Sequence, residues 1–145
     1  MRKIPRGFIV IALLGIASAC STLPRETTVL RASITPSELE PGDTAVMSVQ
    51  LLDGLNRVSK VHGVIKQDPS LTFKLKDDGI SPDAVAGDGI WTLQVDVPFN
   101  APPGDFVLTM SMLDEQGEPV LVENELGEIH PLTASFSLVI RYPKR

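Results

Sequence analysis

Apolar residues alternate with polar ones along seven short runs of this sequence, and that alternation restricts its fold more than any other feature. A period of two places successive side chains on opposite faces of an extended backbone, so each run predicts a half-buried β-strand. The runs span residues 29–34, 45–51, 59–66, 71–75, 91–97, 106–112 and 136–140. No stretch beyond residue 27 combines a helical period with helix caps, so we expect no helix there.

The apolar side of each run is expected to face a common core. The expected core residues are Leu30, Ala32 and Ile34; Ala45, Met47, Val49 and Leu51; Val61 and Ile65; Leu71, Phe73 and Leu75; Trp91, Leu93, Val95 and Val97; Phe106, Leu108, Met110 and Met112; and Phe136, Leu138 and Ile140. Run 59–66 is the least regular, because His62 and Val64 point away from Val61 and Ile65.

Turn-forming residues separate the runs, and the chain holds 11 glycines and 12 prolines. The turn signals lie at residues 41–43, 53–54, 67–70, 102–105 and 116–119. Seven short strands with one apolar face each predict an all-β fold, with two antiparallel sheets packed face to face as a sandwich. An open barrel is the competing arrangement, but the long central loop fits a sandwich better. The Cys…Trp…Cys pattern of antibody domains is absent, so the sandwich is similar to disulfide-free immunoglobulin-like or fibronectin III-like modules.

The beginning of the chain has the features of an export signal. Residues 1–6 carry three positive charges, and residues 7–19 are apolar or small. This arrangement is typical of a cleaved secretory signal peptide, and the apolar run is shorter than the about 20 residues that span a membrane. A buried core helix is the alternative, but the run lacks caps and basic residues crowd its start.

Residues 17–20, Ala-Ser-Ala-Cys, resemble the lipobox of bacterial lipoproteins, and Cys20 is the single cysteine of the chain. The resemblance implies that the thiol of Cys20 is diacylglycerated, that residues 1–19 are removed and that the new amino group is acylated. An ordinary cleavage site beside an incidental cysteine is the alternative. On this prediction residues 20–27 are the lipidated cysteine and a short tether, and residues 28–145 form the immunoglobulin-like sandwich domain.

The lipoprotein resemblance also predicts an address. In that family an Asp after the cysteine signals inner-membrane retention in enterobacteria, whereas this chain has Ser21. We therefore expect a lipid-anchored protein of the cell envelope whose first partner is the membrane. The outer membrane, with the domain facing the periplasm or the surface, is preferred to the inner membrane.

The loop before the fifth run contains four aspartates: Asp77, Asp78, Asp83 and Asp88. Its Asp-Asp-Gly, middle Asp and Ala-Gly-Asp-Gly precede an aromatic residue and a threonine, which resembles a motif of bacterial extracytoplasmic immunoglobulin-like domains. The resemblance covers residues 45–117. It implies an adhesion, sensing or assembly module without catalytic activity.

The four aspartates have two interpretations. Asp side chains accept hydrogen bonds from backbone N–H groups two residues further on, so the loop can satisfy its own polar groups. Alternatively, Asp77, Asp78, Asp83 and Asp88 supply oxygen ligands to Ca²⁺, although their spacing does not match an EF-hand. We favour the first interpretation. No cofactor is then expected beyond the covalent lipid, and Ca²⁺ is the alternative.

The charge of the chain bears on its partners. The formal net charge is −5, and it becomes more negative if residues 1–19, which hold three basic residues, are removed. Nucleic-acid binding depends on Lys and Arg contacts with phosphates, so we expect no nucleic-acid partner.

Catalysis is not expected either. The two histidines, His62 and His130, lie in no recognisable catalytic or metal-binding pattern, and the acidic pair Glu123 and Glu125 lacks aromatic neighbours for a sugar. A non-catalytic binding or adhesion module for an envelope protein or glycan is the preferred function. A structural or assembly subunit that pairs through a sheet edge is the alternative.

Overall fold

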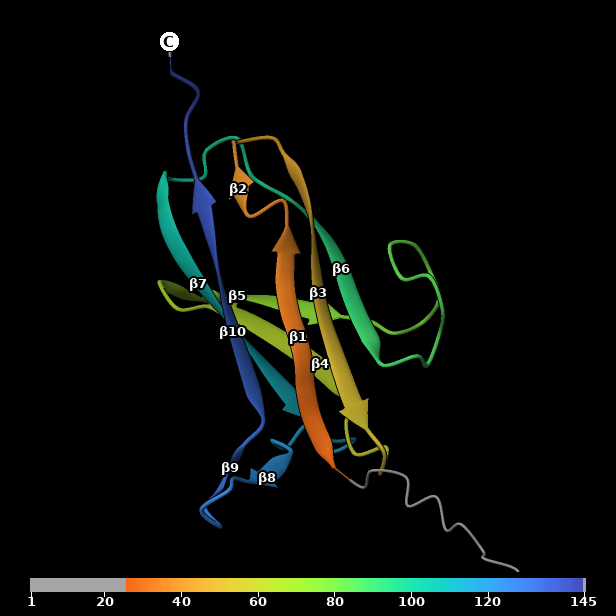
Figure 1. Cartoon of the computed structure of the whole chain (residues 1–145). Helices are drawn as coiled ribbons and strands as arrows, with labels where there is room; N and C mark the ends of the chain where they lie inside the picture. The colour runs from red at the N-terminus through yellow and green to blue at the C-terminus, as the bar shows by residue number, and fades with distance from the viewer. Residues whose placement is uncertain (1–25, 145) are drawn as a thin grey trace, which may run out of the picture.

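Ten strands make up the regular structure of residues 26–144, which are the residues that the computed structural model describes (Figure 1). They are β1 (Thr27–Thr35), β2 (Glu38–Leu39), β3 (Thr44–Asp53), β4 (Lys60–Ile65), β5 (Asp68–Leu75), β6 (Ile90–Asp96), β7 (Gly104–Leu113), β8 (Leu121–Glu123), β9 (Ile129–Pro131) and β10 (Thr133–Ile140). Each of the seven runs coincides with one of the seven longer strands. Strands β2, β8 and β9 have only two or three residues, too few for an alternation to be recognised in the sequence.

The longer strands form two sheets. One sheet has the order β1-β3-β6, and the other has the order β2-β10-β7-β4-β5. Neighbouring strands are antiparallel except for the short parallel pair β2–β10. Strands β8 and β9 form a separate hairpin, and Figure 1 shows β1 and β3 crossing in front of β4 and β5. The prediction of an all-β fold built from antiparallel sheets is confirmed.

One core lies between the two sheets. Its most deeply buried large side chains are Leu39, Met47, Val49, Val61, Leu108, Met110 and Met112. Six of these seven belong to the expected stripes; Leu39, on the unpredicted strand β2, is the exception. Every buried core residue of the described chain lies between Ile34 and Leu138, so this stretch carries its own core.

The position of Leu30 in the core was predicted wrongly. A β-bulge lies between Val29 and Arg31, where the register with β3 shifts. A bulge adds one residue to a strand, so the inward face changes from odd to even positions along β1. Val29 packs against the core before the bulge and Ala32 after it, whereas Leu30 is 56% exposed.

Two of the expected stripes are less buried than the sequence predicts, because β5 and β6 are edge strands. Leu71 on β5 is 49% exposed. On β6, Trp91, Leu93 and Val95 pack against the core but remain only half-buried. These two edges border the candidate site.

The predicted signal peptide, Cys20 and most of the predicted tether fall outside the described residues. Within residues 26–144, no helix is long and apolar enough to cross a membrane.

Candidate functional site

An apolar cavity of about 380 Å³ opens between the two sheets. Its walls come from β5 and β6, from the ends of β1, β4 and β10, from the segment that links β6 to β7, and from single residues of β2, β3 and β7. The volume falls within the range of about 300–1,000 Å³ that is usual for ligand pockets. The ends of β1 and β10, which contribute Ile34 and Ile140 to the lining, lie at the end of the domain opposite the start of β1 (Figure 1).

The cavity exists because β5 and β6 are joined at one point only. The Lys76 N–H donates to the Thr92 carbonyl at 2.9 Å, and the Thr92 N–H donates to the Lys76 carbonyl at 2.8 Å. Beyond this bridge β5 pairs with β4 and β6 pairs with β3, in different sheets. The core is therefore open along this side between Leu71 on one strand and Val95 on the other.

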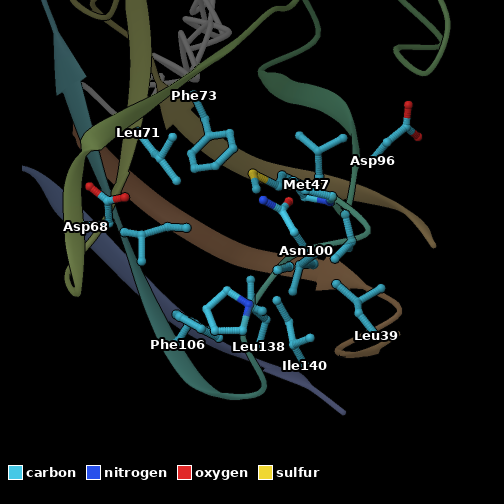
Figure 2. Close-up of a pocket in the computed structure, with 17 residues that line it drawn as sticks. Leu39, Met47, Asp68, Leu71, Phe73, Asp96, Asn100, Phe106, Leu138 and Ile140 are labelled. Carbon is cyan, nitrogen blue, oxygen red and sulfur yellow. The ribbon is translucent and has the colours of Figure 1, made fainter. Parts of the chain in front are cut away.

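Apolar side chains dominate the lining. The lining residues are Ile34, Leu39, Met47, Ile65, Asp68, Leu71, Phe73, Val95, Asp96, Val97, Pro98, Asn100, Ala101, Pro102, Phe106, Leu138 and Ile140. Figure 2 shows Leu71 and Phe73 across the space from Phe106, Leu138 and Ile140. Such a lining favours the binding of an apolar group by removing its surface from water.

Three polar residues are part of the lining, and two of them carry negative charge. They are Asn100, Asp68 and Asp96, and Figure 2 shows the carboxylates of the two aspartates on opposite sides of the space. Asp68 accepts hydrogen bonds from the backbone N–H and hydroxyl of Ser70, and Asp96 accepts one from Thr44 Oγ1 at 2.7 Å. No Lys, Arg or His lines the cavity. The two charged residues that line the cavity are therefore both negative.

The segment between β6 and β7 is held in place at both ends. The Val97 N–H donates to the Asp43 carbonyl at 2.8 Å. The Tyr142 hydroxyl, beyond β10, donates to the Ala101 carbonyl at 2.8 Å. These bonds position the Val97–Pro102 wall of the cavity before any ligand binds.

The aspartate loop between β5 and β6 brings together three of its four predicted residues. Carboxylate oxygens of Asp77, Asp83 and Asp88 lie within 4.8 Å of one another, and Asp83 is only 4% exposed. Asp78 is not part of this group. A convergence of three carboxylates is compatible with a cation and is also common without one.

Backbone donors already bind these carboxylates. Asp77 accepts from the N–H groups of Gly87 at 2.7 Å and Gly89 at 3.0 Å. Asp83 accepts from the Gly79 N–H at 2.6 Å. Asp78 and Asp88 each accept from the N–H two residues further on, at 3.0 and 2.9 Å. The loop thus has the self-bonded arrangement that the first interpretation requires.

The two histidines do not share a site. His62 lies on β4, and burial, followed by the charges of Lys74 and Lys60, lowers its pKa from the ordinary value of 6.5. His130 lies on β9 in the separate hairpin, where it is exposed and its Nδ1 is 3.1 Å from the Pro131 carbonyl oxygen. Neither histidine lines the cavity.

The cavity was not predicted from the sequence. Its lining residues are spread from Ile34 to Ile140, and most of them were assigned to the core. A local signal existed only at residues 98–103, where three prolines interrupt the strand pattern. The predicted lipidation site, Cys20, lies outside the described residues.

The similarity of this chain to known proteins is limited to the fold of a few solved structures. No protein-family model and no curated protein matches this sequence. Two solved structures show a distant likeness at 16% identity: the endo-β-1,4-mannanase of Thermotoga petrophila, with a TM-score of 0.48, and the alkylpurine DNA glycosylase AlkC of Pseudomonas fluorescens, with a TM-score of 0.46. The aligned parts cover 84% and 80% of this chain but only 21% and 30% of those chains. At these scores the likeness carries no argument about function.

Proposed function

We propose that this chain is a lipid-anchored protein of the cell envelope whose sandwich domain is a non-catalytic binding module. The observation that carries the binding role is the apolar cavity, whose lining includes two carboxylates. The anchor and the envelope address rest on the resemblance of residues 17–20 to a lipobox. The covalent lipid on Cys20 is the only attached group in this proposal.

The strand arrangement supports an immunoglobulin-like or fibronectin III-like type. The seven longer strands divide into three in one sheet and four in the other, the division found in small sandwiches of this class. Modules of this class carry binding sites on a rigid sheet framework.

Binding is a better match to the cavity than chemistry. Its lining includes no histidine, cysteine, serine or lysine, and each of its two carboxylates, Asp68 and Asp96, already accepts a hydrogen bond from a neighbouring hydroxyl. Asp68 and Asp96 remain as charges at the mouth, where they select among ligands.

The orientation of the domain agrees with a tethered binding module. Strand β1 starts at one end of the domain, and the strand ends that contribute Ile34 and Ile140 to the cavity lie toward the other (Figure 1). An anchor on Cys20 would hold the end that contains Thr27 close to the membrane, so the cavity would lie in the part of the domain further from the lipid.

The anchor is tested by intact-mass analysis and membrane fractionation. The purified protein is expected to start at Cys20 and to carry the additional mass of acyl chains, and Cys20→Ala is expected to move the protein out of the membrane fraction. An unmodified chain that starts at another residue contradicts the anchor, and so does unchanged membrane retention of Cys20→Ala.

The binding role is tested separately with residues 26–144, which contain the whole described core. The neutral dye N-phenyl-1-naphthylamine is expected to gain fluorescence on entering the cavity. Leu71→Asp places a charge at the half-exposed wall and is expected to weaken dye binding by about tenfold or more. The matched control Leu126→Asp changes an exposed leucine that does not line the cavity, and it should leave binding unchanged. Absence of saturable dye binding by the unaltered domain would contradict the binding role.

A further inference from the structure

Strand β5 has an open backbone edge. In an antiparallel ladder, alternate residues direct their N–H and C=O groups toward opposite edges. Lys76 directs both groups at Thr92 on β6. Thr72 and Lys74, which are four and two residues earlier, therefore direct theirs toward the same side, where no described strand pairs with them.

The facing strand β6 has an open edge as well. The Val97 N–H bonds to the Asp43 carbonyl of the segment that leads into β3. Gln94 and Asp96 alternate with Val97 and thus direct their backbone groups away from β3. The Lys76–Thr92 bridge is the first pair of a ladder that does not continue, because the two strands belong to different sheets.

The open edge of β5 runs along the mouth of the apolar cavity. Leu71 and Phe73 alternate with Thr72 on this strand, and both line the cavity. A strand added beside β5 would place every second side chain next to them, above a space of about 380 Å³. Main-chain pairing then provides affinity, and the cavity provides specificity for apolar side chains.

The charges around the mouth indicate the composition of the added segment. Asp68 and Asp96 lie on opposite sides of the space, and no cationic residue lines it (Figure 2). Lys74 of β5 alternates with Phe73, so its side chain lies on the face of the strand away from the cavity. Lys or Arg residues that flank an apolar stretch are complementary to this pair of carboxylates. An acyl chain or another small apolar molecule would fill the cavity but would leave the backbone groups of Thr72 and Lys74 unpaired.

We propose that the partner is a protein segment in extended conformation, apolar at alternate positions and flanked by Lys or Arg, which adds as a strand to the free edge of β5. The proposal rests on the proposed binding role of the cavity and names its ligand class. It also unites the two functions considered from the sequence, because the same surface is a binding site and a sheet edge.

The test uses the full lipoprotein in nanodiscs of neutral phosphatidylcholine and a fluorescein-labelled peptide in which valines alternate with threonines between flanking lysines. Fluorescence anisotropy is expected to show saturable binding that empty nanodiscs lack. N-methylation of one alternate set of peptide residues is expected to weaken binding by about tenfold or more, and methylation of the other set by much less, because only one edge of the peptide pairs with β5.

Variants of the protein test the same edge. Thr72→Pro removes an outward-facing N–H without removing a bond to β4, and it is expected to weaken peptide binding about tenfold, whereas Thr72→Ala retains the N–H and the affinity. Asp68→Asn and Asp96→Asn should weaken the lysine-flanked peptide and not a serine-flanked one. The methylated peptides require no variant, so a fold defect in Thr72→Pro leaves the test intact.

The outcomes separate the two proposals. Dye binding together with peptide binding that is absent, or that neither methylated set weakens, overturns strand addition and leaves the binding role standing. Failure of both the dye and the peptide overturns both proposals. Concentration-dependent self-association that Thr72→Pro abolishes identifies the added strand as a second copy of this chain and overturns the foreign segment.

Discussion

The Thr92 hydroxyl is the buried side-chain polar atom of the described residues that has no hydrogen-bond partner. Thr92 is 8% exposed, and its backbone forms the bridge to Lys76. Leaving a hydroxyl buried without a partner costs about 1–3 kcal/mol. Thr92 therefore lowers stability at the point where the two sheets are joined.

Thr92→Val is expected to raise the free energy of unfolding by about 1 kcal/mol, because valine has a similar shape and no hydroxyl. Urea denaturation of residues 26–144 measures the change. Thr44→Val is the matched control, since the Thr44 hydroxyl is exposed and donates to Asp96. A free energy of unfolding that rises in Thr44→Val but not in Thr92→Val would contradict this expectation. A lower free energy of unfolding in Thr92→Val would show that the Thr92 hydroxyl has a hydrogen-bond partner in solution.

His62 is expected to make stability depend on pH. Burial and the nearby Lys74 and Lys60 lower its pKa below 6.5, so the folded state binds this proton less readily than the unfolded chain does. Above the unfolded pKa both states hold the neutral ring, and the free energy of unfolding has its full value. As the pH falls from about 6.5 toward the folded pKa, the unfolded chain takes up the proton first, and this stability is lost. Stability should therefore decrease in this window.

An NMR titration of the His62 ring measures the pKa directly, and unfolding free energies at several pH values measure the linkage. Lys74→Gln is expected to raise the pKa only part of the way, since burial is the larger cause. His62→Gln should flatten the stability profile in this window. A His62 titration midpoint at or above 6.5 would contradict the assignment.

At the scale of single elements, the bulge in β1 determines which side chains reach the core. Leu30 lies at the bulge and is exposed, whereas Ile34 follows it and is buried. Ile34→Ala should cost about 2 kcal/mol or more of unfolding free energy, and Leu30→Ala should stay within about 0.5 kcal/mol. Thermal and urea denaturation of the pair provide the measurement. Equal losses in the two variants would mean that β1 has no bulge at this position.

The aspartate loop is the second element with a measurable consequence. Two backbone N–H groups stabilise the Asp77 carboxylate, and one each stabilises Asp83 and Asp88. These charge-assisted bonds offset the repulsion among the three carboxylates without a metal. We therefore expect only a small difference in melting temperature between EDTA and millimolar Ca²⁺.

Trp91 fluorescence reports the melting, because Trp91 follows the loop directly on β6. A ligand at a hundredfold excess over its Kd stabilises by about 2.7 kcal/mol if it binds the folded state alone. A shift of many degrees that Ca²⁺ produces, that Mg²⁺ does not, and that Asp83→Asn abolishes would establish a Ca²⁺ site in the loop.

At the scale of the whole molecule, both sheets contribute to one core, so residues 26–144 should unfold in a single transition. Trp91 lies in the sheet β1-β3-β6, and far-ultraviolet circular dichroism reports all strands. The two signals are expected to give the same urea midpoint. Two separate midpoints would mean that the open side between β5 and β6 divides the domain into independent halves.

The sequence by itself determined the positions of the seven longer strands and most of the core. Strand alternation is a local property, because each inward side chain is recognised from its immediate neighbours. The convergence of aspartates in one loop was also visible, since Asp77, Asp83 and Asp88 lie close together along the chain. The lipobox prediction for Cys20 is likewise local and stays a prediction.

The tertiary structure alone decided the bulge, the edges and the cavity. A bulge depends on the register with a partner strand, so Leu30 was assigned to the wrong face. The position of a strand at the edge of a sheet depends on which strands pair, and for that reason Leu71 is half-exposed despite its place in an apolar stripe. The cavity brings Ile34 and Ile140 to the same space, and such proximity arises only when the two sheets close around a core that they do not completely fill.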